Sequence, residues 1–271
     1  MSDINDIICD LGKNTRKYIY HTQLKMKATH KLTFFYDCLS PFSCLAHAVI
    51  KRYANIWPVQ LEYRPFLLGG VMATTKNLPP AARPWSEATR KIAAQDMQRN
   101  HGYFNCAMLN LPNNFFGPDG PSDKRGLARD MRYMRLLTAI RLEHPDSLLA
   151  ATDHIFNIIH VGQEYRDANN NVLLTESLLE SVCTSAGIAT KDAHHLVHVR
   201  ITENDVKKLL IDSVTEGIEK GSYGSPTIVI SKLDNTIDEQ SYFGADRFEQ
   251  MAYTNQWPWV GPDPSRPTAK I

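Results

Sequence analysis

Cysteine is scarce in this chain of 271 residues, which has five at scattered positions. They are Cys9, Cys38, Cys44, Cys106 and Cys183. An odd, scattered set does not make a disulfide framework and is typical of a protein kept in a reducing compartment. No CxxC pair and no cluster of cysteine and histidine has the spacing of metal ligands, so we expect no metal site.

An excess of charge of one sign is also missing. Lysine and arginine total 30 against 29 aspartate and glutamate, which gives a net charge of +1 with no long basic run. This balance argues against nucleic acid as a partner. No apolar stretch approaches the roughly 20 residues of a membrane span, so we expect none. The hydrophobic content of 43% is nevertheless enough for a packed core.

Residues 32–43 are the stretch around which the chain is organised, because an aromatic, apolar run there breaks at a proline. The run predicts a buried strand. Pro41 has no N–H and a φ suited to a first helical turn, so we expect Ser40 at the N-cap of the following helix. The free N–H groups at such a helix start favour an anion. From this stretch alone, the simpler interpretation is that Ser40 only caps the helix.

Two regions with strand patterns flank a long helical region. Their expected elements are a strand at 31–36, a helix from 41 to about 55 and a strand at 59–63, then strands at 227–230 and 240–243 and a helix from 248 to about 254. The first set predicts a right-handed βαβ unit with a parallel pair, and the second predicts an antiparallel hairpin with a turn at Asp234 and Asn235. Joined, they make an α/β fold with a four-stranded mixed sheet, which is the thioredoxin-like arrangement.

The region between them shows only helical periodicity, so we predict a large all-helical domain inserted between the βαβ and ββα halves. Its expected helices are 84–100, 125–142, 146–161, 175–186, 192–199 and 202–220, with a polar loop at about 101–123. The predicted organisation is a mobile N-terminal extension at 1–30, a first thioredoxin-like part at 31–83, the insertion at 84–220, a second thioredoxin-like part at 221–262 and an extended tail at 263–271.

Several short motifs resemble the kappa-class glutathione transferases, in the same order along the chain. Ser40-Pro41-Phe42-Ser43 stands where DsbA-like thioredoxin folds carry Cys-Pro-x-Cys, and Tyr36-Asp37-Cys38-Leu39 precedes it. The others are Arg64-Pro65, Asn77-Leu78-Pro79-Pro80, Leu136-Leu137-Thr138-Ala139, Leu142-Glu143-His144-Pro145, Tyr223-Gly224-Ser225-Pro226-Thr227 and Phe243-Gly244-Ala245-Asp246-Arg247. The resemblance covers about residues 31–262, and the related 2-hydroxychromene-2-carboxylate isomerases share the fold and the serine.

The resemblance implies a role for each matching residue. Ser40 would hydrogen-bond the glutathione sulfur at the start of the helix, beside Pro41, Phe42 and Ser43. The backbone of Ser225, before a cis Pro226, would pair with the cysteinyl part of the tripeptide in the manner of strand addition.

The remaining residues would bind the rest of the tripeptide. Asn77 would contact glutathione from the loop after the second strand, Asp246 would bind the γ-glutamyl amino group and Arg247 its carboxylate. Ala245 stands where family members often have serine. Taken singly, Asp246 could be a helix cap, Asn77 a turn residue and Pro226 a trans edge-strand proline.

The implied activity is glutathione conjugation to small electrophiles, with glutathione as co-substrate and no prosthetic group. Ser40 would donate to the sulfur and stabilise the thiolate, which would also be able to reduce a peroxide. The alternatives are a glutathione-dependent isomerase of the 2-hydroxychromene-2-carboxylate type, a disulfide oxidoreductase, which would need cysteines at positions 40 and 43, and a non-catalytic binding protein. Cys38 and Cys44 flank the serine and are interpreted as core residues.

The resemblance also implies a homodimer. The C-terminal Ala269-Lys270-Ile271 is a variant of the Ser-Lys-Leu peroxisomal address, with the mitochondrion or cytoplasm as alternatives. The second substrate is expected to bind between the helical insertion and the Ser40 turn, under the loop at about 101–123.

Overall fold

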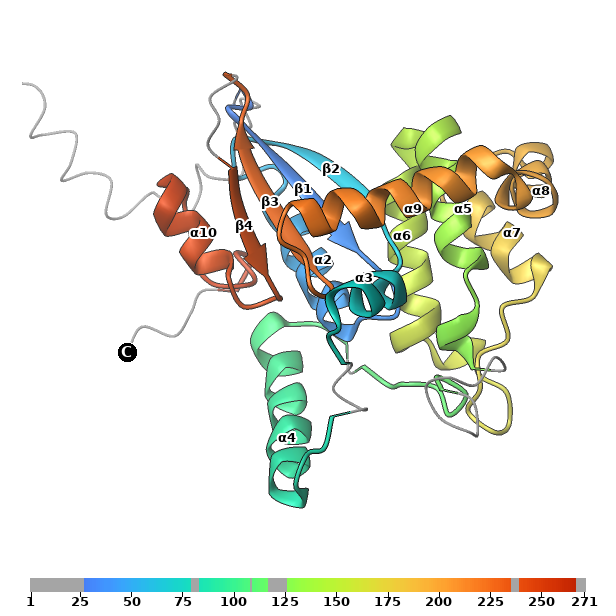
Figure 1. Cartoon of the computed structure of the whole chain (residues 1–271), viewed down its shortest axis with the longest axis horizontal. Helices are drawn as coiled ribbons and strands as arrows, with labels where there is room; N and C mark the ends of the chain where they lie inside the picture. Colours follow the sequence, from blue (N-terminus) through green and yellow to red (C-terminus); the bar gives the residue numbers. More distant parts are fainter. Residues whose placement is uncertain (1–26, 79–82, 108, 117–125, 235–238, 267–271) are drawn as a thin grey trace, which may run out of the picture.

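The computed structural model describes residues 27–78, 83–107, 109–116, 126–234 and 239–266. The predicted N-terminal extension at 1–30 lies almost wholly outside these residues. Asn235 of the predicted turn and the C-terminal tripeptide at 269–271 also lie outside them. Within them, strands and helices alternate at the two ends of the chain and helices fill the middle (Figure 1).

The sheet has four strands in the order β2-β1-β3-β4. Its strands are β1 (His30–Tyr36), β2 (Val59–Pro65), β3 (Thr227–Lys232) and β4 (Glu239–Phe243). The β1 strand pairs parallel with β2 and antiparallel with β3, while β4 pairs antiparallel with β3. The four-stranded mixed sheet predicted from the sequence is therefore confirmed.

The central position of β1 explains its aromatic run. Phe34 and Tyr36 are buried on one face, in the large core cluster that includes Leu45 of α2 (Pro41–Tyr53). Phe35 is buried on the other face. There it clusters with Val71 of α3 (Leu68–Thr75) and with a valine of α9 (Asn204–Glu219). A strand with helices on both faces needs no polar side, so its residues do not alternate.

The sequence pattern predicted no helix between the strand at 59–63 and the helix at 84–100, so α3 was not expected. Gly69 and Gly70 stand in its first turn, and its N-cap residue Leu67 makes no capping side-chain hydrogen bond. Both features weaken the usual helix signals. The helix is held instead by packing on the sheet.

The inserted helices occur in the predicted order, with different bounds. They are α4 (Glu87–Phe104), α5 (Arg132–Glu143), α6 (Leu148–Phe156), α7 (Glu176–Ser185), α8 (Thr190–His198) and α9. The helix predicted to begin at 125 begins at Arg132. Residues Leu127–Arg129 form a separate short turn that ends at Asp130, and the Asp130 side chain accepts from the Arg132 N–H at 3.0 Å. The helix predicted at 146–161 is split into Pro145–Ser147, α6 and a π-helical turn, Asn157–Val161.

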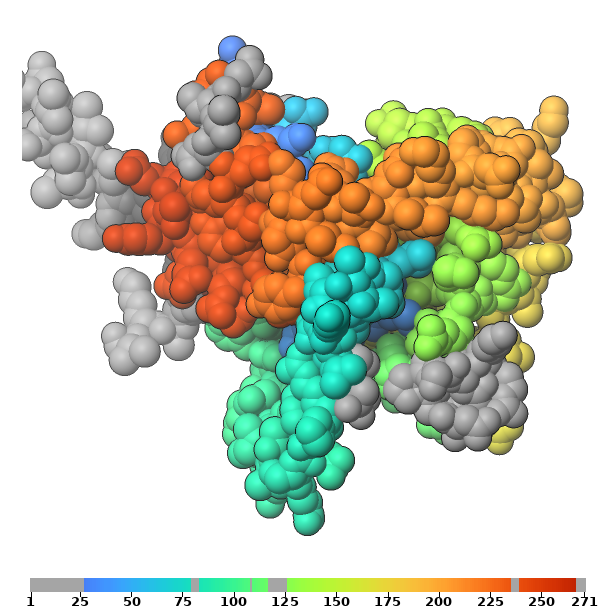
Figure 2. All heavy atoms as spheres, viewed as in Figure 1, coloured from blue at the N-terminus to red at the C-terminus, as the bar shows by residue number. Residues whose placement is uncertain are grey.

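Helix α4 projects from the body of the molecule as a lobe (Figure 2). Most of its side chains are exposed, including Ile92 and Tyr103. The last helix, α10 (Phe248–Asn255), lies beside β4 at the opposite end from α8 (Figure 1). None of the helices in the described ranges is long and apolar enough to cross a membrane.

Candidate functional site

Three serine side chains meet at the N-terminus of α2. The Ser40 hydroxyl donates to the Ser225 carbonyl oxygen at 2.8 Å and accepts from the Ser43 N–H at 3.2 Å. The hydroxyls of Ser43 and Ser225 lie 2.7 Å apart. All three residues are buried, so the predicted N-cap serine is built into a network as well as capping a helix.

The segment before β3 has the predicted form. The Ser225–Pro226 peptide bond is cis. Asn77 reaches the same segment, because its side-chain amide donates to the Tyr223 carbonyl oxygen at 2.7 Å. Asn77 therefore lies beside the segment that carries Ser225, although it is remote in the chain, and it is half-buried.

Asp37 is a second buried group of the site, and the sequence analysis gave it no role. Its carboxylate accepts from the N–H of Leu39 at 3.0 Å, the N–H of Leu68 at 2.8 Å and the hydroxyl of Tyr133 at 3.2 Å. Its own N–H donates to Ser225 Oγ at 2.9 Å. Burial raises the pKa of Asp37 from 3.8 to about 6, against the lowering effect of these hydrogen bonds. Asp37 thus ties β1 to α3, to α5 and to the cis-proline segment.

Asp246 and Arg247 follow β4 and are both exposed. Their loop approaches the cis proline, since the Gly244 N–H donates to the Pro226 carbonyl oxygen at 3.1 Å. Arg247 Nε lies 3.7 Å from Asp246 Oδ1. The N-cap position of α10 is occupied by Arg247, so Asp246 is not the helix cap. Ala245, between this pair and Gly244, is buried.

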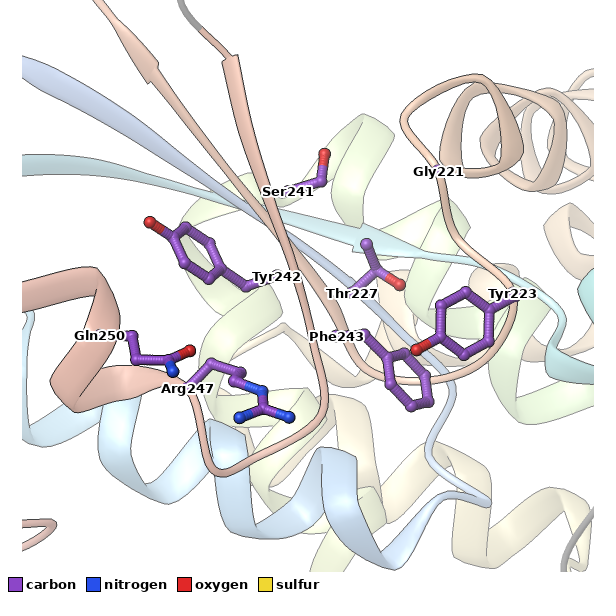
Figure 3. Close-up of a pocket in the computed structure, with 8 residues that line it drawn as sticks. All are labelled: Gly221, Tyr223, Thr227, Ser241, Tyr242, Phe243, Arg247 and Gln250. Carbon is purple, nitrogen blue, oxygen red and sulfur yellow. The ribbon is translucent and has the colours of Figure 1, made fainter. Parts of the chain in front are cut away.

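A cavity of about 340 Å³ lies beside the end of β4 (Figure 3). Arg247 is the one predicted site residue that lines it, together with Tyr223 and Phe243, whose rings pack 4.2 Å apart. The Arg247 side chain and Gln250 lie across β4 from that aromatic pair (Figure 3). Ser40 does not line this cavity, so the cavity adjoins the serine network without including it.

A larger cavity of about 560 Å³ lies between α2 and the helical insertion. Cys44 and His47 of α2 line it, along with Ala107 and Leu109 from the start of the loop predicted to cover the second-substrate pocket. His47 is buried, and its ring contacts the Tyr63 hydroxyl at 2.9 Å and Asp153 at 3.1 Å. This cavity begins one helical turn beyond Ser40, so it is close to the expected pocket but does not open on the serine.

The cysteines near Ser40 are unsuited to act as nucleophiles. Burial raises the pKa of the Cys38 thiol well above its usual value and raises that of Cys44 to about 12. Both thiols are free. Their interpretation as core residues fits these surroundings.

Comparisons with known proteins bear on this arrangement. Residues 31–256 match the family model of the DSBA-like thioredoxin domain. The chain is 31% identical to glutathione S-transferase kappa 1 of Rattus norvegicus over 90% of this chain and 99% of that protein. It is 30% identical to glutathione S-transferase kappa 1 of Homo sapiens, over 88% and 96% of the two chains. The chain belongs to the kappa-class glutathione transferases.

Solved structures show that this kappa-class chain shares its fold with other thioredoxin-like proteins. A 2-hydroxychromene-2-carboxylate isomerase superposes with a TM-score of 0.58 at 19% identity, over 83% of this chain and 94% of that chain. The cytosolic disulfide reductase DsbM from Pseudomonas aeruginosa superposes with a TM-score of 0.53 at 12% identity, over 83% and 97%. The DsbA-like fold predicted from the sequence is confirmed.

Proposed function

We propose that this chain binds glutathione beside the cis proline, lowers the pKa of its thiol at the start of α2 and transfers the thiolate to a small electrophile. The observation that carries the proposal is the hydrogen bond from the Ser40 hydroxyl to the Ser225 carbonyl oxygen. It places a hydroxyl donor, a helix N-terminus and the peptide carbonyl that precedes Pro226 within one hydrogen bond of each other.

The Ser40 hydroxyl changes partner in this proposal. The cysteinyl N–H of glutathione donates to the Ser225 carbonyl oxygen, as in strand addition. This releases the Ser40 hydroxyl, which then donates to the sulfur and keeps its acceptor bond from the Ser43 N–H. The sulfur also lies near the Phe42 N–H, which belongs to the first turn of α2, where N–H groups have no partner within the helix.

The energies are sufficient for such activation. Lowering the thiol pKa of about 8.5 by about 2 units takes about 2.7 kcal/mol of preference for the anion. A helix N-terminus contributes about 0.3–2 kcal/mol and a hydrogen bond to a charged group about 1.5–3 kcal/mol. The two effects together therefore reach the required value without a positively charged side chain at the sulfur.

The γ-glutamyl end of the tripeptide binds Asp246 and Arg247 in this proposal. Both side chains are exposed and lie on the loop that contacts Pro226, so no buried group has to move. Their charges oppose those of the amino and carboxylate groups of the ligand. Asn77 contacts glutathione from the end of α3. Ala245 has no polar side chain, so only its backbone can bind the ligand.

The bound thiolate attacks the electrophilic carbon and expels a halide or opens a strained bond, with the electron pair leaving on the displaced group. The same thiolate would reduce a hydroperoxide by attacking its O–O bond, giving an alcohol and a sulfenic form of glutathione. A second glutathione resolves that form to the disulfide and water. Both reactions use one activated sulfur and no prosthetic group.

The test is conjugation of glutathione to 1-chloro-2,4-dinitrobenzene, with the ultraviolet absorbance of the bound thiolate titrated against pH. Loss of the Ser40 donor should raise the pKa of the bound thiol in Ser40→Ala and slow conjugation at neutral pH about 10- to 100-fold. Ser86→Ala is a matched control, because Ser86 caps α4 through the Thr89 N–H. That variant should lose a helix cap and keep its activity.

Two results would contradict the proposal. If wild type neither binds glutathione nor ionises it, Ser40 is a helix cap only, and a non-catalytic binding protein becomes the better interpretation. If Ser40→Ala ionises bound glutathione as wild type does, the hydroxyl has no part in activation.

Assembly and location are further parts of the proposal. We expect a homodimer, which the exposed apolar side chains Ile92 and Tyr103 on the projecting α4 support. Light scattering during size-exclusion chromatography tests it, and a monomer at micromolar concentration would contradict it. We also expect peroxisomal import through the C-terminal tripeptide, which deletion of these three residues from a fluorescent fusion would abolish.

A further inference from the structure

A group of potential metal ligands lies on the helical insertion, where the sequence analysis expected none. Glu180 of α7 and His194 and His198 of α8 each offer one ligand atom, and the three atoms lie within 4.8 Å of one another. We propose that Glu180, His194 and His198 bind a divalent transition-metal ion of the zinc type that joins α7 to α8. This goes beyond the proposed glutathione chemistry and does not depend on it.

The geometry follows from two neighbouring helices joined by a short turn. His194 and His198 are four residues apart on α8, so they lie on one face of that helix. Their rings stack with centroids 4.2 Å apart. Residues Glu176 and Glu180 have the same spacing on α7, and each approaches His198. Helix α7 therefore presents two carboxylates to α8, and α8 presents two imidazoles to α7.

The two nitrogens of His198 face different carboxylates. Its Nε2 lies 2.8 Å from Glu180 Oε1, and its Nδ1 lies 3.7 Å from Glu176 Oε2. Two ligands of one zinc ion at about 2.0–2.2 Å are typically about 3–3.5 Å apart, so the His198–Glu180 pair is already near the required separation. Glu176 can then accept from the Nδ1–H and hold the ring, as carboxylates behind histidine ligands do.

The position of His194 distinguishes a metal site from an ordinary ion pair. One carboxylate is enough to pair with His198, whereas His194 adds a second imidazole nitrogen to the same small volume. His194 is exposed and the His198 and Glu180 side chains are about one-third exposed, so small rotations bring all three onto one ion without repacking the core.

The ligand set selects the class of metal. Two imidazole nitrogens and one carboxylate suit Zn²⁺, Co²⁺, Ni²⁺ or Cu²⁺, whereas Mg²⁺ prefers oxygen ligands. Three protein ligands leave a position for water. The site lies at the end of the molecule away from the sheet and from α2, so the ion acts on the helical insertion and not on the Ser40 site (Figure 1).

The experiment uses the full chain without an affinity tag, stripped with a chelator and titrated calorimetrically with Zn²⁺ and, separately, Mg²⁺. We expect one Zn²⁺ per chain, a rise of several degrees in the unfolding temperature with excess Zn²⁺, and no Mg²⁺ binding. His194→Ala, His198→Ala and Glu180→Gln should each weaken Zn²⁺ binding at least about tenfold. Visible absorption of the Co²⁺-loaded chain should report nitrogen ligation and be lost in the two histidine variants.

His195→Ala is the matched control, because His195 is exposed on the same helix and outside the group of three. It should bind Zn²⁺ as wild type does. Glutathione conjugation should be the same in all of these variants, which separates this proposal from the proposed function. Absence of Zn²⁺ binding in wild type, or equal binding in His194→Ala, His198→Ala and wild type, would overturn it.

Discussion

Asp37 is the residue whose buried charge has the clearest consequence for stability. Its pKa is about 6 in the folded chain, since burial disfavours the ionised form, and 3.8 without that burial. At a pH between 3.8 and about 6, Asp37 is protonated more often in the folded state than in the unfolded state. The contribution of Asp37 to stability is therefore fully present below about pH 4 and is lost as the pH rises through about 6.

We expect Asp37→Asn to remove this pH dependence. Asparagine loses an acceptor for the Leu68 N–H, so the variant should be less stable than wild type at about pH 4. Between about pH 4 and pH 7, the difference in unfolding free energy should move in favour of the variant by up to about 3 kcal/mol. Urea unfolding of both proteins across this range measures it.

Asp205→Asn is a control of opposite sign. Asp205 is exposed, and hydrogen bonding from Arg200 lowers its pKa to about 2. Its contribution to stability is present above pH 4 and is lost as the pH falls toward 2, so replacing it should not produce the trend expected for Asp37. A parallel pH dependence in wild type and Asp37→Asn would show that Asp37 does not titrate with a raised pKa.

At the scale of single elements, α9 depends on a glycine that packs against the sheet. A Cβ at Gly217 would lie 3.2 Å from Phe66 Cδ2 and 3.5 Å from Phe35 Cδ1. Both rings are almost fully buried and cannot easily move aside. The glycine therefore sets the separation between α9 and the sheet, in spite of its cost of about 1 kcal/mol to the helix.

Gly217→Ala should destabilise the protein by about 1 kcal/mol, because overpacking of about 1–3 kcal/mol exceeds the gain in helix propensity. Gly69→Ala in α3 is the matched comparison, since a Cβ there meets nothing within 4 Å. That variant should be more stable by about 0.5–1 kcal/mol. Urea unfolding of both compares them, and stabilisation by Gly217→Ala would show that the Phe66 ring can yield.

At the scale of the whole molecule, the insertion and the sheet share one core. The main hydrophobic cluster contains Phe34 of the sheet together with Leu137 and Ile155 of the insertion. Polar contacts cross the same boundary, as between the hydroxyls of Tyr36 and Thr152 at 2.7 Å. The domain boundaries at 84 and 220 stay a prediction from sequence, and the packing does not divide there.

We therefore expect the chain to unfold in one transition. Three of its four tryptophans, Trp57, Trp257 and Trp259, cluster beside α2 and α10, so tryptophan fluorescence reports chiefly on the sheet half. Far-ultraviolet circular dichroism reports mostly on the helices of the insertion. The two signals should give the same midpoint in urea. Separate midpoints would mean that the insertion unfolds independently.

The sequence alone determined the features that depend on neighbouring residues. The aromatic run gave the central strand, the Ser40-Pro41 step gave the start of α2, and the change of period at both ends of the chain gave a mixed sheet with a helical insertion. These signals arise from backbone sterics, capping and periodic burial, which act within about one or two helical turns. The family motifs then indicated Ser225, Asp246 and Arg247.

Only the tertiary structure decided which groups meet across the chain. The Ser40 hydroxyl reaches a carbonyl 185 residues away, and Asp37 reaches the hydroxyl of Tyr133, 96 residues away. Helix α3 forms without a capping side chain because the sheet holds it, and Glu180 meets two histidines because α7 and α8 pack together. No local pattern encodes such encounters, since they depend on how separate elements share one core.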